Sequence, residues 1–192
     1  MRSVTDIIRE SISVKEAIIQ TPQLIRTIEQ VALALVEAFK NDRKVLFCGN
    51  GGSAADAQHI AAELSGRFYI ERRPLYAEAL HVNTSYVTAI ANDYSYDEIF
   101  ARSVSGMGRA GDVLVGITTS GSSPNVINAI ATAREIGMTT VGMTGEAESK
   151  LATGCDYLLN VPSRDTARIQ EAHIMIGHII CEIVEVSLFS GQ

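Results

Sequence analysis

The alternation of short apolar runs with helical patterns constrains the fold of this chain more than any other feature. The apolar runs predict strands over 44–48, 76–81, 112–117, 139–143 and 156–161. Helical patterns follow or separate them, over 53–65, 84–91, 97–107, 124–136, 146–152 and 166–188. Short apolar strands separated by helices indicate a parallel sheet with helices on both faces, which is an α/β fold.

Two further helices are expected before the sheet begins. The first covers residues 5–20, and the second starts at Pro22 with Thr21 as its N-cap. Apolar residues continue this second helix at helical spacing, at Leu24, Ile28, Val31, Leu35 and Phe39. We expect residues 1–41 to form a helical hairpin outside the sheet or against a partner chain. Residues 42–192 are then the α/β core of one domain that spans 1–192.

Composition narrows the class of protein. The 192 residues are 46% hydrophobic and 20% charged, which is typical of a globular domain, and the net charge of −6 argues against a nucleic-acid-binding surface. The first ten residues contain no apolar segment of the kind that signal peptides have. The longest apolar stretch, 174–189, is interrupted by three polar residues, so we expect a buried helix and not a membrane span; they are His178, Glu182 and Glu185.

The three cysteines lie inside apolar runs without the spacing of metal ligands. They are Cys48, Cys155 and Cys181. An odd number of thiols in such positions is typical of reduced, buried cysteines, and therefore of a cytoplasmic protein.

Two loops rich in Gly, Ser and Thr follow predicted strands and precede predicted helices. In α/β proteins such loops bind anions, because their N–H groups and the helix N-terminus face the ligand. The first loop, Gly49–Ser53, fits the relaxed dinucleotide fingerprint, but the strand over 76–81 ends without the acidic residue that holds a ribose. Neither loop contains the Gly-Lys-Ser/Thr of a Walker A motif.

The second loop, Thr118–Ser123, is better suited to a phosphate monoester. It supplies five hydroxyl groups and a conformationally free Gly121, and Ser123-Pro124 is expected to start a helix whose free amides face the loop. The alternative is a polar loop that merely caps a helix.

Histidine and carboxylate side chains complete the candidate site. His59 and Glu63 are four residues apart on a predicted helix, about 40° from one another around its axis. They could bind one divalent metal, act as a base and its partner, or simply face solvent. Gln170 and His178 are about 12 Å apart along the last helix, at the edge of reach for one metal, so we expect an active site shared between subunits. His173 and His81 are expected to be structural.

Four stretches together resemble the sugar isomerase (SIS) domain family, over essentially the whole chain. They are residues 48–67, 91–93, 118–125 and 167–173, with His178. Within the family, the resemblance is to isomerases of phosphorylated heptoses. It implies a single SIS domain in a homotetrameric cytoplasmic enzyme. It implies conversion of sedoheptulose 7-phosphate to D-glycero-D-manno-heptose 7-phosphate, the first step towards the heptose of bacterial lipopolysaccharide.

The resemblance also implies roles for particular residues. One zinc ion per active site would be held by His59, Glu63, Gln170 and His178. For proton transfer through an enediol(ate) we assign Glu63 as the base and His178 as a second acid/base. Substrate contacts would come from Asn50, Gly51, Gly52, Ser53, Glu63, Arg67, Asn92, Asp93, Thr118, Thr119, Ser120, Ser123 and Gln170.

The chain departs from the family pattern at two positions. Thr118 stands where some members have Ser, which keeps the hydroxyl group. Ala167 stands where some members have Asp, and the nearby Asp165 is shifted by two residues, so we assign it no role in the site.

Two other functions compete with the isomerase. One is a non-catalytic binding module like the family branch that associates with the bacterial replication initiator, which the presence of both Glu63 and His178 disfavours. The other is a SIS enzyme or sensor for a different sugar phosphate, such as an aminosugar or hexulose phosphate.

Overall fold

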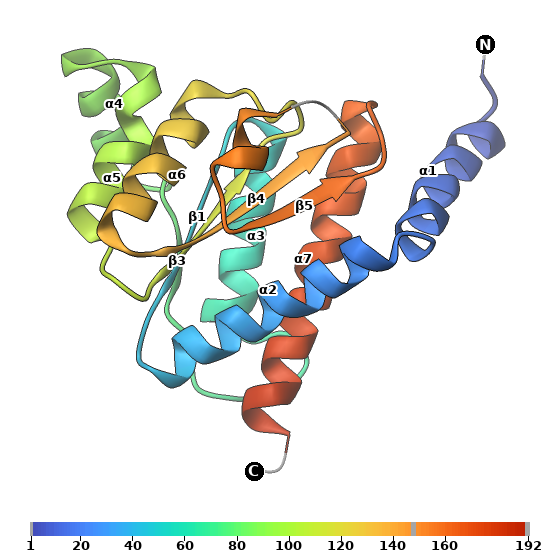
Figure 1. Cartoon of the computed structure of the whole chain (residues 1–192), viewed down its shortest axis with the longest axis horizontal. Helices are drawn as coiled ribbons and strands as arrows, with labels where there is room; N and C mark the ends of the chain where they lie inside the picture. Colours follow the sequence, from blue (N-terminus) through green and yellow to red (C-terminus); the bar gives the residue numbers. More distant parts are fainter. Residues whose placement is uncertain (1, 147–148, 191–192) are drawn as a thin grey trace.

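All five strands of the central sheet are parallel and pair in the order β2-β1-β3-β4-β5 (Figure 1). The structure is a computed structural model that describes residues 2–146 and 149–190. The strands are β1 (Val45–Gly49), β2 (Ala77–Ala79), β3 (Val113–Ile117), β4 (Thr139–Gly145) and β5 (Tyr157–Val161). The predicted strands are therefore all present, and the α/β fold with a parallel sheet is confirmed.

Helices cover both faces of the sheet. The α-helices are α1 (Val4–Ile19), α2 (Pro22–Lys40), α3 (Gly52–Ser65), α4 (Thr84–Asp93), α5 (Ile99–Met107), α6 (Pro124–Ile136) and α7 (Thr166–Phe189). In β1, Val45 and Phe47 enter the core with α2, α3 and α7, whereas Leu46 and Cys48 enter the core with α5 and α6. This alternation is the two-residue period of a strand with both faces buried, and Figure 1 shows the two helical layers.

The strand order places the two predicted anion loops side by side. The chain leaves β1 for β2 on one side and returns to β3 on the other, so β1 and β3 are neighbours with Val45 opposite Val113. In a doubly wound sheet, the point where the strand order reverses is where ligands bind, outside the carboxyl ends of the strands. The loops that follow β1 and β3 both lie at this point.

The helix predicted over 146–152 is wrong in the described residues. Glu146 lies in a bend, residues 147–148 fall outside the described part, and only the short 3-10 turn η2 (Lys150–Thr153) follows. The cause is Ser149, whose hydroxyl accepts a hydrogen bond from the Leu151 amide and donates one to the Gly121 carbonyl. A serine bonded to nearby backbone in this way competes with helix formation.

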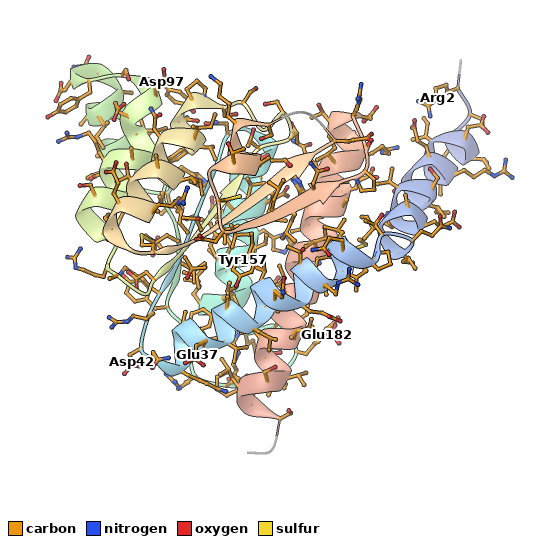
Figure 2. The ribbon with its side chains drawn as sticks, in the orientation of Figure 1. Arg2, Glu37, Asp42, Asp97, Tyr157 and Glu182 are labelled. Atoms are coloured by element: carbon orange, nitrogen blue, oxygen red, sulfur yellow. The ribbon has the colours of Figure 1, made fainter. Side chains whose placement is uncertain are left out.

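The two N-terminal helices are present, and α1 extends away from the rest of the domain (Figure 1). Figure 2 shows Arg2 at its far tip. Val14 and Ile18 are the buried apolar residues of α1. The other large apolar side chains of this helix are exposed, and they are Val4, Ile7, Ile8, Ile12 and Ile19. A single chain thus leaves much of the apolar surface of α1 uncovered.

Helix α7 packs through the middle of the helical layer on its face of the sheet. Among the described helices, it is the one long and apolar enough to cross a membrane, with a mean hydropathy of 1.6. Half of that apolar window is buried, and α7 packs on α2 and α3, so it is a core helix of the domain, as the sequence predicts.

At Gly177, the packing of α7 on α3 leaves no room for a side chain. A Cβ atom at this position would lie 2.5 Å from Cδ1 and 2.7 Å from Cγ1 of Ile60, which is closer than real Cβ contacts occur. Gly177 is therefore required by the distance between the two helices, and not by its own backbone angles.

We predict that Gly177→Ala destabilises the domain by about 1–3 kcal/mol, because the new methyl group must push α7 away from Ile60. Gly106→Ala is the matched control, since its Cβ would meet only the Tyr86 hydroxyl at 3.6 Å. Urea unfolding of both variants measures the difference. If the two variants were equally stable, the inference that the helix packing leaves no room for a side chain at Gly177 would be wrong.

Candidate active site

Three polar side chains from two helices converge on one point. His59 and Glu63 lie one turn apart on α3, and His59 Nε2 is 3.1 Å from Glu63 Oε1. His178 comes from α7, and its Nε2 lies 3.5 Å from the Nε2 of His59. The three potential ligand atoms all lie within 4.8 Å of one another, and we call His59, Glu63 and His178 the metal triad.

The metal triad fits a divalent metal such as zinc. Its donors are two imidazole nitrogens and one carboxylate oxygen, the set that catalytic zinc sites use with a fourth position open. Metal–ligand bonds of 2.0–2.1 Å in a tetrahedron put neighbouring ligand atoms about 3.3 Å apart. The His59–Glu63 and His59–His178 separations of 3.1 and 3.5 Å bracket that value. The side chains of His59 and Glu63 are 48% and 26% exposed, so the site is open to a substrate.

Gln170, the fourth predicted ligand, lies elsewhere in the same chain. A Cβ at Gly52 would be 2.4 Å from Gln170 Nε2, so the Gln170 amide covers the first residue of α3. Gly52 and His59 are seven residues apart, or about 10 Å along the helix. Within one chain, Gln170 therefore lies beside the anion loops, whereas His59 and Glu63 of the metal triad lie on the other half of α3.

The first loop owes its shape to glycine. Gly51 is the N-cap of α3 with φ +56° and ψ −121°, a conformation that a side chain would not tolerate. At Gly49, a Cβ would lie 2.7 Å from the carbonyl oxygen of Ser53, so the turn can close tightly only without one. The amides at the start of α3 are thereby directed to the carboxyl edge of the sheet.

A reciprocal pair of amide hydrogen bonds joins the first loop to the second. Asn50 Nδ2 donates to Asn125 Oδ1 at 2.9 Å, and Asn125 Nδ2 donates to Asn50 Oδ1 at 3.0 Å. The Tyr96 hydroxyl also donates to Asn50 Oδ1, at 3.0 Å. Neither Asn125 nor Tyr96 was among the predicted site residues. The only signal was that Asn125 ends the Ser/Thr stretch that resembles the SIS family.

The second loop, residues 118–123, gathers its hydroxyl groups into one cluster. Thr118 Oγ1 lies 2.9 Å from Ser123 Oγ and 3.4 Å from Ser120 Oγ. Ser123 is the N-cap of α6 as predicted, with Pro124 following, but its side chain makes no capping bond. The first amides of α6 therefore keep their capacity to bind an anion. Gly121 turns the loop with φ +66°.

Arg164 is a residue that the sequence gave no reason to select. A cleft beside Thr119 and Ser120 is also lined by Ser163, Arg164 and Thr166. The exposed Arg164 guanidinium is 4.0 Å from the Glu146 carboxylate. It therefore places a cation beside the hydroxyl cluster, from a loop about 40 residues further along the chain.

The remaining predicted substrate contacts lie on exposed loops and helix ends. Arg67 Nε is 3.6 Å from Glu71 in the loop after α3, and Asn92 donates to Asp93 at the end of α4. Among the described hydrogen bonds, none joins these three predicted residues to the anion loops. Asp165 is the N-cap of α7, where its carboxylate accepts from the amides of Ala167 and Arg168, so it already has a structural role.

The other histidines and the cysteines are largely withdrawn from solvent. His173 is fully buried, lies 3.2 Å from the Thr144 carbonyl, and has its pKa lowered to about 4 by that burial. Burial also lowers the pKa of His81 and raises the pKa of Cys181 to about 12. All three cysteines are free, with Cys48 and Cys181 buried and Cys155 half-buried.

Comparison with known proteins identifies close relatives. The family model of the SIS domain matches residues 8–145. The phosphoheptose isomerase of Clostridium acetobutylicum is 53% identical over 185 residues, which is 96% of this chain and 94% of that protein. That of Aneurinibacillus thermoaerophilus is 51% identical, over 96% and 93% of the two chains.

Solved structures agree with the sequence relatives. The phosphoheptose isomerase of Neisseria gonorrhoeae superimposes with a TM-score of 0.89 at 45% identity, covering 95% of this chain and 96% of that one. The enzyme of Francisella tularensis gives a TM-score of 0.90 at 37% identity, over 96% and 98%.

We predict that His173 makes the fold less stable as the pH falls below about 6.5. The unfolded histidine has a pKa of about 6.5 and the folded one about 4, so the unfolded chain binds more protons in this range. From pH 6.5 to 5 this effect removes about 1–2 kcal/mol. Urea unfolding at both pH values measures the change in the free energy of unfolding. This change should be smaller in His173→Gln than in the wild type, and the contribution of His81 to it should remain. An unchanged pH dependence in the variant would contradict the prediction.

Proposed function

Because this chain belongs to the SIS domain family and within it to the phosphoheptose isomerases, we propose that it converts sedoheptulose 7-phosphate to D-glycero-D-manno-heptose 7-phosphate. The family membership makes the chain a sugar-phosphate isomerase, an enzyme of heptose synthesis. The observation that supports the finer proposal is the metal triad, which groups an accessible carboxylate with two imidazoles. The product would enter the synthesis of the heptose of lipopolysaccharide.

We assign the proton transfers to two residues of the triad. Glu63 takes the proton from C1 of the ketose and returns it to C2, which moves the carbonyl from C2 to C1 through an enediol(ate). His178 gives a proton to O2 and takes one from O1, so the protons balance over the cycle. The 26% exposure of Glu63 supports this role, because a base must reach the substrate carbon.

Zinc is the proposed cofactor, one ion per active site, held by His59, Glu63, Gln170 and His178. When bound, it would supply Lewis-acid polarisation of the sugar carbonyl. The two roles of Glu63 oppose each other, since a carboxylate that binds a metal strongly is a weaker base. His59 is the ligand of the triad without a proposed proton to transfer.

The anion loops are proposed to bind the phosphate. The hydroxyls of Thr118, Thr119, Ser120 and Ser123 and the free amides of α6 would hold it. Asn50, Gly51, Gly52 and Ser53 would contact the sugar from the start of α3. Arg67, Asn92, Asp93 and Gln170 remain proposed contacts.

We further propose that each active site is shared between two chains of a cytoplasmic homotetramer. Along α3, Gly52 lies about 10–16 Å from the residues of the triad in the same chain. The triad of one chain would therefore work with the loops and Gln170 of a second chain. The uncovered apolar surface of α1 supports assembly, because a contiguous exposed apolar surface marks an interaction site.

The first experiment measures turnover of sedoheptulose 7-phosphate before chelation, after chelation, and after zinc is added back. We expect chelation to abolish turnover and zinc to restore it. Glu63→Gln should reduce turnover by at least 10²-fold, because the base is lost. Glu182→Gln, which removes an exposed carboxylate of α7 visible in Figure 2, is the control and should remain active. No turnover by the folded wild-type protein under any metal condition would reject the assigned reaction.

The second experiment tests whether the site is shared, by mixing two inactive variants. Glu63→Gln removes the base, and Ser120→Asp places a repelling carboxylate in the exposed part of the phosphate loop. Random assortment of the two chains should restore about a quarter of the wild-type activity if each site takes its triad from one chain and its loops from another. A mixture as inactive as either variant alone would show that each site is built from one chain.

A further inference from the structure

A buried carboxylate on α7 holds the loop that follows α3. The Glu185 side chain is 2% exposed and accepts hydrogen bonds from the backbone amides of Phe68, Tyr69 and Ile70, at 3.0, 2.6 and 2.8 Å. The Arg72 side chain is 1% exposed and donates from Nε to Glu185 at 2.8 Å. The loop over residues 66–72 is therefore ordered around one side chain of another helix.

The same arginine ties this loop to the last turn of α3. Arg72 Nη2 donates to the carbonyl of Glu63 at 2.9 Å, and Nη1 donates to the carbonyls of Leu64 and Gly66 at 2.9 and 3.1 Å. The last carbonyls of a helix have no partner within it, so Arg72 satisfies them. One of these carbonyls belongs to Glu63 itself, the carboxylate of the metal triad.

The loop also reaches the other side of the triad. The Phe68 ring lies 5.5 Å from the His178 ring, and the His178 ring lies 5.0 Å from that of His59. Glu185 and His178 are seven residues apart on α7, which is about two turns and thus the same face. The Glu185–Arg72 pair consequently contacts both helices that supply the triad, through the Glu63 backbone on one and through Phe68 on the other.

Stability alone is a poor explanation for such a pair. A buried ion pair loses so much solvation that apolar residues of the same volume often serve the fold equally well. Burial would raise the pKa of the Glu185 carboxyl, but its hydrogen bonds to the loop amides and Arg72 lower it below the ordinary value. The carboxylate is thus held charged, with a hydrogen bond to each part of the loop that it orders.

We propose that Glu185 and Arg72 are positioning residues that hold Glu63 and His178 in place within the metal triad, an inference that rests on the metal site of the proposed function. Neither residue belongs to the metal triad. They act through the Glu63 backbone and the Phe68 ring, and they set the affinity of the triad for zinc.

The test compares two buried carboxylates with similar partners. Asp112 is 2% exposed at its side chain and, like Glu185, accepts from backbone amides and from one cation, here Lys44. Its partners, Lys44 and Arg109, lie outside loop 66–72. We compare Glu185→Gln with Asp112→Asn by titrating zinc into the metal-free full-length protein in competition with a chromophoric chelator. Urea unfolding reports the loss of stability in each.

We expect Glu185→Gln to weaken zinc binding by about 10–100-fold, as changes to residues behind metal ligands do. Asp112→Asn should stay within about twofold of the wild type even if it is equally destabilised. Equal zinc affinity in Glu185→Gln and wild type would overturn the positioning role and leave the proposed enzyme intact. A wild-type protein that binds no zinc would remove the metal site, and this inference with it.

Phe68→Leu decides the matter if Glu185→Gln does not fold. It keeps the ion pair and the backbone hydrogen bonds of the loop, and it removes the ring that contacts His178 and Tyr69. We expect this variant to bind zinc several-fold more weakly in the same titration, although the hydrogen bonds of the loop to Glu185 are retained. Wild-type affinity in this folded variant would contradict transmission through Phe68, and with it the proposal.

Discussion

The close contact between α3 and α7 is the constraint on which the candidate metal site depends. His59 and Glu63 are fixed relative to each other by the helix that carries both, whereas His178 is 119 residues away from His59 in the chain. The packing of α3 against α7, tight enough at Ile60 that a Cβ at Gly177 would not fit, brings the third ligand to the others. Loop 66–72, bonded to Glu185 and Arg72, then closes the end of the same helix pair. Packing and chemistry are thus set by the same interface.

The doubly wound sheet supplies the second constraint. The reversal of strand order between β1 and β3 places both anion loops at one edge, and α3 leaves that edge carrying His59 and Glu63 of the metal triad on its second half. One helix therefore carries two candidate functional regions, the glycine-rich turn at its N-terminus and the His59–Glu63 pair about 10–16 Å further along.

The sequence predicted the sheet and most helices because apolar periodicity is a local property. It also predicted that His59 and Glu63 share a face, since that follows from helix geometry alone. The helix predicted over 146–152 was wrong, because Ser149 hydrogen-bonds to the distant Gly121 and this bond competes with the helix. The Asn50–Asn125 pair and the Glu185–Arg72 pair were missed because their partners are 75 and 113 residues apart. Gln170 lies on Gly52 in the folded chain, and its assignment to the metal by resemblance stays a prediction.

The amide pair between the two loops also bears on the chemical durability of the protein. Asn50 precedes Gly51, and an asparagine before glycine is the sequence most prone to deamidation, in which the next backbone nitrogen attacks the side-chain carbonyl. That attack requires the side chain to rotate onto its own backbone. Here Asn125 and Tyr96 hold the Asn50 amide by three hydrogen bonds. The hydrogen bonds that shape the loop therefore also slow the deamidation of Asn50.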